Sequence, residues 1–483
     1  MKLRVGNSPS KTGWESSILK SVSIPRRRRN LSDAARSIFR AALGEVRADR
    51  LVRRSVRRQG MKLIIQGRVF DLDSYERVFL IAMGKAAPFM ADSLSGILGG
   101  WLTQGIAICS REQRVRSDKI ACLPAAHPLP DERSVRAARK IVSLAKKAGP
   151  QDLVFVLISG GASAQVCLPR PPVTLAAKRR ITDALLRAGA DIVELNTVRK
   201  HLSEVKGGRL AEAACPAAVV NLVVSDVLGN DLESIASGPT HWDSTTFADA
   251  RRILNKYRLW TQAPAAARKV IEEGSSGRIP ETLKKGSPVF RRVSTFIIGD
   301  NETALKAASN RSAELGFRPI ILCAGDSGEA RKAAGKYAAA ADEIVRAGKP
   351  TRAPLCLLAG GELTVTVKGK GKGGRNTEFV LASLLEFTKR PPFRPSKAGA
   401  RRWNFLVASL GTDGRDGPTD AAGAWATAAT SLRAERLGLS AAEYLDRNDS
   451  YNFFRQAGGL ITTGPTRTNV MDLRLILLEP DRD

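Results

Sequence analysis

The stretch Leu153-Val-Phe-Val-Leu-Ile158, followed by Ser159-Gly-Gly-Ala-Ser163, decides the fold. Its six consecutive apolar residues predict a strand that is buried on both faces, as in a parallel sheet covered by helices. The small residues that follow let a ligand approach the backbone, and ligands in such sheets bind beyond the carboxyl ends of the strands. The stretch therefore predicts a buried strand with a binding site at its end.

The same change from apolar to small or charged residues recurs along the chain. Further strand ends of this kind are Met83-Gly-Lys-Ala-Ala87, Ser225-Asp-Val-Leu-Gly229, Gly299-Asp-Asn301, Ala359-Gly-Gly-Glu362 and Gly411-Thr-Asp-Gly414. A helix that follows such a turn offers free backbone N–H groups and a positive dipole end to an anion. The recurrence predicts an α/β fold with a Rossmann-like parallel sheet flanked by helices, and a site that handles phosphate.

Breaks in this pattern divide the chain into two α/β domains behind a basic segment. Residues 1–30 lack periodicity and contain Arg26–Arg29, and three interpretations stay open: a disordered extension, a transit peptide, or a start assigned too early. Helical spacing of apolar residues starts at Leu31. The polar stretch Gly274–Gly277 closes the first domain, predicted at 31–285, and a smaller α/β domain is predicted at 290–483.

Composition narrows the cellular setting. No apolar run reaches the roughly 18 residues that a membrane span requires. Six cysteines without a C-x-x-C pair indicate thiols of a reducing compartment. We therefore expect a cytoplasmic protein without a membrane partner, and the sequence leaves a homodimer open.

The formal net charge of +30 predicts attraction to anions. Residues 1–60 hold 16 Lys and Arg against 4 Asp and Glu, so much of the charge lies at the start of the chain. Aromatic side chains that stack on bases are scarce there, with only Trp14 and Phe39. Nucleic acid is therefore expected only as a non-specific partner of the basic segment, and the expected ligands are small anionic metabolites.

Phosphoryl transfer requires cations at the moving phosphoryl group, a metal site and a group that orients the attacking hydroxyl. Lys85 follows a strand and has small neighbours, so it is a candidate cation. The loop Gly369–Asn376 contains G-x-G-x-x-G but is itself cationic, which favours a polyphosphate cradle over a dinucleotide fold. Strand-end carboxylates that suit Mg²⁺, or a base at Asp413 or Asp226, are Asp226, Glu362, Asp413 and Asp416.

A second basic stretch joins Arg199-Lys200-His201 to Lys206-Gly207-Gly208. It brings cations, an imidazole and small residues into a few positions. An arginine fork there would suit the carboxylate of a substrate. A basic helix end that faces solvent is the alternative interpretation.

Ordered motifs between residues 31 and 478 carry a family resemblance. They are Met83-Gly-Lys-Ala-Ala87, His127-Pro-Leu-Pro-Asp131, Ser159-Gly-Gly-Ala-Ser-Ala164, Asn196-Thr-Val-Arg-Lys-His-Leu-Ser203, Lys206-Gly-Gly-Arg-Leu-Ala211, Ser225-Asp-Val-Leu-Gly229, Ser237-Gly-Pro-Thr240, Gly360-Gly-Glu362, Gly373-Gly-Arg-Asn376, Gly411-Thr-Asp-Gly-Arg-Asp-Gly-Pro-Thr419 and Thr463-Gly-Pro-Thr-Arg-Thr-Asn-Val470. Together they resemble the class II glycerate 2-kinases, whose smaller carboxy-terminal domain is of the MOFRL type. The resemblance implies transfer of the ATP γ-phosphoryl group to the 2-hydroxyl of D-glycerate, with Mg²⁺, in a cleft between the two domains.

The resemblance also implies site residues. The family's catalytic lysine falls on Lys85 and its catalytic arginine on Arg375, and we add Asp413 as the base. Metal ligands are assigned to Asp226, Glu362 and Asp416. Residues assigned to the substrate are Ser159, Gly160, Gly161, Ser163, Arg199, Lys200 and His201. Residues assigned to the nucleotide are Gly84, Lys206, Gly207, Gly208, Gly371, Gly373, Gly374 and Asn376.

One enzymatic alternative is an NAD(P)H-dependent hydroxypyruvate reductase. Such an enzyme requires a dinucleotide fold with an acidic residue about 20 positions beyond the glycine loop. The loop at Gly369 is the only candidate, and no convincing acid follows it at the end of a second strand. A kinase with an added nucleic-acid-binding tail is the other alternative.

Overall fold

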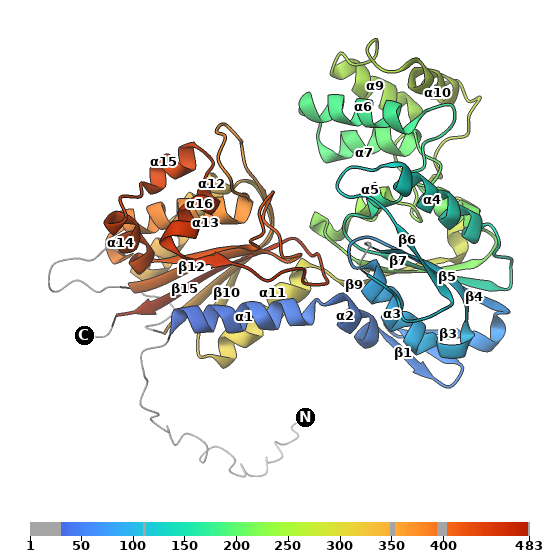
Figure 1. Ribbon diagram of the computed structural model, residues 1–483. Helices are drawn as coiled ribbons and strands as arrows, with labels where there is room; N and C mark the ends of the chain where they lie inside the picture. Colours follow the sequence, from blue (N-terminus) through green and yellow to red (C-terminus); the bar gives the residue numbers. More distant parts are fainter. Residues whose placement is uncertain (1–29, 110–112, 348–352, 394–402, 482–483) are drawn as a thin grey trace, which may run out of the picture.

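The computed structural model describes residues 30–109, 113–347, 353–393 and 403–481. The basic segment predicted at 1–30 therefore lies outside the described residues, except for Asn30, which caps the first helix. Two six-stranded sheets, each with its own helices, form the bulk of the molecule (Figure 1). The predicted α/β fold is confirmed.

The first sheet is parallel throughout, in the order β6-β5-β4-β7-β8-β9. Its strands are β4 (Arg77–Met83), β5 (Leu102–Cys109), β6 (Ile120–Pro124), β7 (Asp152–Ile158), β8 (Ala218–Val224) and β9 (Val293–Gly299). Every residue of β7 and β8 is buried, as the unbroken apolar run in β7 predicted. The carboxyl ends of β4, β7 and β8, which carry the glycine-rich turns, thus lie next to one another.

Helices cover this sheet and extend beyond it. Those close to the sheet are α2 (Ala48–Ser55), α3 (Ala87–Leu98), α4 (Glu132–Ala145), α5 (Ala162–Gln165) and α8 (Arg209–Ala214). Four more form a separate layer with its own apolar core, seen at the top of Figure 1: α6 (Leu175–Arg187), α7 (Ile192–His201), α9 (Phe247–Lys256) and α10 (Ala265–Ser275). A small antiparallel sheet flanks the domain with β1 (Val56–Gln59), β2 (Lys62–Ile65) and β3 (Arg68–Asp71).

The second sheet is mixed, in the order β10-β11-β15-β12-β13-β14. Only β10 and β11 pair in parallel, and the other neighbours pair antiparallel. Its strands are β10 (Arg318–Glu329), β11 (Leu355–Thr364), β12 (Trp403–Gly411), β13 (Gly423–Thr427), β14 (Leu460–Ile461) and β15 (Asp472–Pro480). The final strand, β15, lies in the middle of the sheet.

Helices lie on both faces of the second sheet (Figure 1). On one face are α12 (Ala330–Ala347), α13 (Arg375–Lys389), α14 (Ala428–Arg436), α15 (Ala441–Asp446) and α16 (Ser450–Ala457). On the other face are α1 (Leu31–Glu45) and α11 (Asn301–Glu314). A single apolar cluster links α1 and α11 through the second sheet to β4 and α3 of the first.

The predicted boundary at 285–290 does not separate the residues of the two sheets. Strand β9 lies beyond that boundary, yet it pairs with β8 because Val219–Val224 line up with Val293–Gly299. Helix α1 lies before it, yet packs against α11 and the second sheet. The chain therefore crosses between the two sheets after α1 and again after β9.

Candidate active site

The turns after β4 and β7 interlock and fix Lys85. Gly84 has a φ of +107°, and a Cβ there would lie 2.2 Å from the carbonyl oxygen of Ser159, so only glycine fits. The backbone N–H of Lys85 donates to the carbonyl of Gly160 at 2.8 Å, and Ser159 Oγ accepts from the N–H of Ala86 at 3.1 Å. Gly84 thus shapes the turn by backbone contact, and Lys85 projects from a rigid base.

Lys85 joins the two sheets. Its Nζ donates to Asp413 Oδ2 at 2.7 Å, and Asp413 follows β12 of the second sheet. The two side chains are 34% and 19% exposed, so a ligand can reach both groups. The structure thus brings together two of the three predicted catalytic residues.

Asp226 lies beside this pair, at the end of β8. Its Oδ2 accepts from Asn469 Nδ2 at 2.8 Å, and a Cβ on Gly160 would lie 2.1 Å from the same oxygen. Burial, helped by the negative charge of Glu362, raises the pKa of Asp226 to about 6. Asn469 was not predicted as a site residue, although it belongs to the motif Thr463–Val470.

Arg375, the first residue of α13, is held by two carboxylates. Its Nε donates to Asp472 Oδ2 at 2.6 Å, and its Nη1 lies 2.7 Å from Glu362 Oε1. Charge pairing outweighs burial, and the pKa of Arg375 is raised. Loss of solvation raises the pKa of the Glu362 carboxyl, which also faces Asp472. Asp472 was not predicted, because only the central position of β15 brings it to this end of β11.

Asp416 has a different role from the predicted metal ligand. Its carboxylate accepts from the backbone N–H groups of Asn376 and Thr377 at 2.8 and 2.9 Å, and from Thr377 Oγ1 at 2.7 Å. It therefore caps the start of α13, where a negative charge also meets the positive helix dipole. Asn376 is buried and donates to Asp416 and Asp472, so it orders this end of α13.

The loop Gly369–Asn376, which we predicted to bind a polyphosphate, forms hydrogen bonds with other parts of the protein. The N–H of Gly371 donates to the carbonyl of Arg447, and the N–H of Lys372 donates to Asp449, at 2.9 and 2.8 Å. A Cβ on Gly373 would lie 2.3 Å from Ser450 Oγ, and one on Gly374 would lie 2.4 Å from Asp416. These glycines let the loop pack closely, and its exposed lysine side chains are what remains for an anion.

The described carboxylates at this centre do not form a complete set of metal ligands. Over the described ranges, no three His, Cys, Asp or Glu side chains come together as a ready set of ligands. The pKa values of Asp226 and Glu362 are both raised, first by loss of solvation, and the charge of Glu362 adds to the effect on Asp226, so a cation beside them would offset these shifts. Hard carboxylate oxygens with few protein ligands fit Mg²⁺, which keeps several waters and binds substrate phosphates.

Ser163, in the short helix α5, is the centre of a second group. Its Oγ accepts from Arg199 Nη2 and from Lys206 Nζ, each at 2.8 Å, and lies 2.9 Å from Ser237 Oγ. Arg199 is near the end of α7, which starts at a capping box formed by Asp191 and Glu194. The predicted substrate residues Ser163 and Arg199 are therefore in contact.

Lys200 and His201 face carboxylates and not Ser163. Lys200 Nζ lies 3.2 Å from Asp243 Oδ1, and His201 Nε2 lies 3.1 Å from Glu281 Oε2. Both side chains are buried, so these predicted substrate residues belong to an internal ion-pair network. A Cβ added at Gly207 would lie 2.9 Å from Thr282 Cγ2, and one added at Gly208 would lie 2.9 Å from Leu283 Cβ, so both glycines let this turn pack closely.

Comparison with known proteins decides the family. The MOFRL family matches residues 355–472, and a domain of unknown function (DUF4147) matches residues 34–272. Glycerate 2-kinase of Pyrococcus horikoshii is 38% identical over 434 residues, which cover 90% of this chain and 94% of that protein. The chain belongs to the class II glycerate 2-kinase family. It is therefore an enzyme, and a kinase.

Other members of this glycerate 2-kinase family agree in sequence and in fold. D-glycerate 2-kinase of Thermotoga maritima is 38% identical, over 83% of this chain and 91% of that one. The crystal structure of glycerate kinase from the same organism superposes with a TM-score of 0.78 at 35% identity, covering 93% and 99% of the two chains. A protein of Agrobacterium vitis named putative hydroxypyruvate reductase is 40% identical, over 83% and 99%.

His127 adds an imidazole to the centre of this kinase. A Cβ on Gly161 would lie 2.9 Å from His127 Cδ2 and 3.3 Å from Lys85 Cγ, so the glycine leaves room for both side chains. Burial, and then the charge of Lys85, lower the pKa of His127 to about 4. The imidazole is therefore neutral at physiological pH. Only its motif, His127–Asp131, indicated this position in the sequence.

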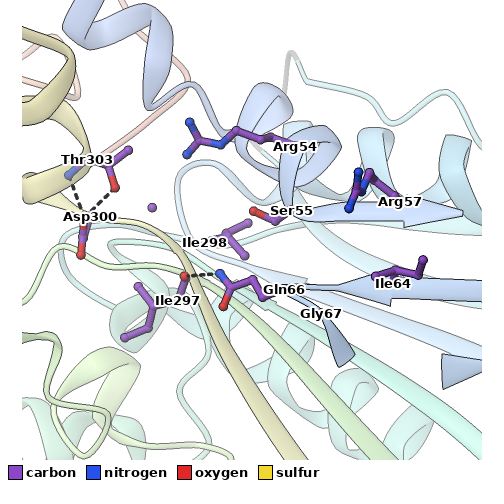
Figure 2. Close-up of a pocket in the computed structure, with 11 residues that line it drawn as sticks. Arg54, Ser55, Arg57, Ile64, Gln66, Gly67, Ile297, Ile298, Asp300 and Thr303 are labelled. Carbon is purple, nitrogen blue, oxygen red and sulfur yellow. Dashed lines mark hydrogen bonds between the residues drawn. The ribbon is translucent and has the colours of Figure 1, made fainter. Parts of the chain in front are cut away.

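A cavity of about 380 Å³ lies at the junction of α2, β2 and β9 (Figure 2). Arg54, Arg57 and Gln66 line it, and Gln66 Nε2 donates to the carbonyl of Ile297 at 2.8 Å. It contains none of the predicted site residues. The charged centre of this kinase is therefore distinct from this cavity. No described helix is both long and apolar enough to span a bilayer.

Proposed function

We propose that this enzyme transfers the γ-phosphoryl group of ATP to the 2-hydroxyl of D-glycerate, giving 2-phospho-D-glycerate, between its two sheets. The observation that carries the proposal is the contact of Lys85 Nζ with Asp413 Oδ2 at 2.7 Å, which joins strand ends from both sheets. Arg375, Glu362 and Asp226 lie around this pair. The names of the relatives, glycerate 2-kinase and D-glycerate 2-kinase, supply the substrate.

Two cations have the roles that phosphoryl transfer needs. Lys85 and Arg375 neutralise negative charge on the phosphoryl group as it moves, an effect that is strong where water is excluded. Arg375 is pre-oriented, because Asp472 and Glu362 fix its guanidinium. Asp416 supports this position by capping the helix that starts with Arg375.

Asp413 is the proposed base. It is partly exposed and already accepts a hydrogen bond from Lys85, so its carboxylate can also orient a hydroxyl. His127 is close to the same pair and neutral, and is thus a second group able to accept a proton. A base must lie within hydrogen-bond reach of the proton it removes, which here means the 2-hydroxyl of the acceptor.

Mg²⁺ fits Asp226 and Glu362, two carboxylates near Lys85 whose pKa values are raised. When bound, the ion would draw together and neutralise the phosphate oxygens of the nucleotide. Asn469 holds one oxygen of Asp226 in place. Asp416 is set apart from this pair because its own oxygens are occupied by α13.

The test is product identification by NMR after incubation of the protein with D-glycerate, ATP and Mg²⁺. We expect 2-phospho-D-glycerate, and its loss in Lys85→Ala and Arg375→Lys. The second variant keeps a positive charge beside Asp472 and so limits damage to the fold. Arg57→Met, in the cavity of Figure 2, is the control and should keep full activity. Formation of another phosphorylated position would overturn the proposed regiochemistry.

Hydroxypyruvate reductase is the second candidate, and the names of the Agrobacterium vitis relatives favour it. Its cofactor would need backbone N–H groups of the loop at Gly369–Gly374, where the N–H groups of Gly371 and Lys372 already bind residues 447 and 449. Oxidation of NADH with hydroxypyruvate, in a sample that forms no phosphorylated product, would replace the kinase proposal with this one.

A further inference from the structure

Three basic side chains gather around Ser163 without an acid among them. They are Lys178, Arg199 and Lys206, here called the acid-free cluster. Lys178 and Lys206 are buried, while Arg199 and Ser163 are partly exposed. Their location is the junction of α5, α6 and α7, beyond the end of β7.

The hydrogen bonds of the acid-free cluster reach only neutral oxygens. Lys206 Nζ donates to the carbonyl of Ser163 at 2.9 Å, to its Oγ at 2.8 Å and to the carbonyl of Ala236. Lys178 Nζ donates to the carbonyl of Leu202 at 3.1 Å. The acidic groups that act on Lys178 are the thiol of Cys167 and Glu204, and Glu204 already pairs with Arg170 at 2.8 Å. The Cys167 thiol also lies near Arg199 and Lys206, but among the described residues no carboxylate forms an ion pair with any of the three cations.

This arrangement is costly unless an anion completes it. Burial of a charge without a counter-charge costs several kcal/mol in proteins. Burial lowers the pKa of Lys206 and of Arg199, and it lowers that of Lys178 to about 8; Arg199 adds to the effect on both lysines by repulsion. A negatively charged group next to Arg199 would offset both the cost of burying these three cations and the repulsion among them.

We infer that Arg199 binds the carboxylate of the acceptor acid, and that Ser163, Lys206 and Lys178 act as positioning residues behind it. The inference rests on the proposed function for the identity of that acid. Arg199 offers a planar fork, which matches a carboxylate. Lys206 has its three donors occupied, so it acts by holding Ser163. Lys178 contributes its charge.

The position suits a short hydroxy acid. A Cβ added at Gly161 would lie 3.3 Å from Lys85 Cγ, and Ser163 comes two residues later in the same turn. Two residues span at most about 7 Å. The hydroxyl of an acid whose carboxylate meets Arg199 would therefore point along this turn toward Lys85 and Asp413. The phosphate groups belong at the opposite end, with Lys85 and Arg375.

Calorimetric binding without nucleotide is the test. The probes are D-glycerate, D-lactate and the uncharged D-glyceramide, each titrated into the full chain. We expect the two acids to bind and the amide to fail. Arg199→Met should weaken acid binding by roughly 10- to 150-fold, the range for hydrogen bonds to charged groups. Arg57→Met, which removes one positive charge at the cavity of Figure 2, should change binding by less than about twofold.

Steady-state kinetics separate positioning from folding. In Lys206→Met and Ser163→Ala, KM for D-glycerate should rise while KM for ATP stays constant. Ser163→Thr, which keeps the hydroxyl, should restore KM. A rise in both KM values, or no rescue by threonine, would mean that these residues only support the fold, and would overturn their positioning role.

The outcomes distinguish this inference from the proposed function. Acid binding that depends on Arg199, without phosphoryl transfer, would uphold the carboxylate site and refute the kinase proposal. Phosphoryl transfer with an unchanged KM in Arg199→Met would do the reverse. Loss of ATP binding instead of acid binding in Arg199→Met would make the cluster a phosphate site and overturn the inference.

Discussion

Arg199 and Lys200 are neighbours in α7, yet their surroundings are opposite. Lys200 meets Asp243 and Glu233 at 3.2 and 3.6 Å, whereas Arg199 meets the hydroxyl of Ser163. Successive side chains of a helix point about 100° apart, so one faces the α9 side and the other the end of β7. The comparison shows that the role of a charged residue cannot be inferred from the sequence until its partners in the fold are known.

The surroundings of Lys200 and of Arg199 predict different effects of mutation. The neutralised network around Lys200 and His201 should matter for stability, because removing one partner leaves another charge buried. The acid-free cluster should matter for binding, and its removal should relieve strain on the folded state.

The largest expected effect is on folding. Lys200→Met leaves Asp243 buried and without its closest cation, so the free energy of unfolding should fall by about 3–5 kcal/mol. Urea denaturation followed by circular dichroism measures it. Lys269→Met is the control, since Lys269 is an exposed residue 4.0 Å from Glu273, and it should cost less than about 1 kcal/mol. A loss of less than about 1 kcal/mol in the free energy of unfolding of Lys200→Met would contradict the predicted difference between the two regions.

The next effect concerns pH. The pKa of Lys178 falls from 10.5 to about 8 on folding, so the folded state binds fewer protons between these values. Stability should therefore rise as pH increases through that window, by about 3 kcal/mol from this group. Lys178→Met should be more stable than wild type at pH 7 and should lack the rise. Equal slopes in denaturation at pH 7, 8, 9 and 10 would contradict the prediction.

Ligand stabilisation follows. D-glycerate at 100 times its Kd should raise the free energy of unfolding by about 2.7 kcal/mol. Thermal or urea denaturation with and without the acid measures the gain. Arg199→Met should lose the gain, and Arg57→Met should keep it. Retention of the gain in Arg199→Met would place the acid elsewhere.

The smallest stability effect is expected at the proposed catalytic pair. Lys85 and Asp413 are partly exposed, so Lys85→Met should change the free energy of unfolding by no more than about 1 kcal/mol. Its phosphoryl transfer should nevertheless be lost. A variant that is inactive because it unfolds would show a much larger change and would remove Lys85 from the catalytic set.

Local sequence was sufficient for the strand ends. Apolar runs that closed in glycine and a charge predicted the first sheet, in which Lys85 and Asp226 follow the parallel strands β4 and β8. Asp413 follows β12 of the second sheet, which pairs antiparallel with its neighbours. The strand-end predictions of the fold are confirmed, because each depends on a single strand. The prediction that Arg199 and Ser163 share a ligand stays a prediction.

Other features depend on tertiary contacts and could not be predicted in this way. Whether Asp416 faces a metal or caps α13 is decided by packing between residues 40 positions apart. Asp472 reaches Arg375 only because the last strand inserts beside β11. The glycines at 371–374 predict a phosphate loop equally well as a loop that packs against residues 447–450.

The crossing of the chain after α1 has a consequence for its synthesis. Residues Ile38, Phe39 and Ala42 of α1 are buried against a core that includes Leu305 and Leu475. On the ribosome, α1 therefore emerges long before most of the surface that covers it, and at ordinary elongation rates it waits for tens of seconds. Its apolar face thus stays uncovered during most of translation, and the last strand to be translated completes the core around the first helix.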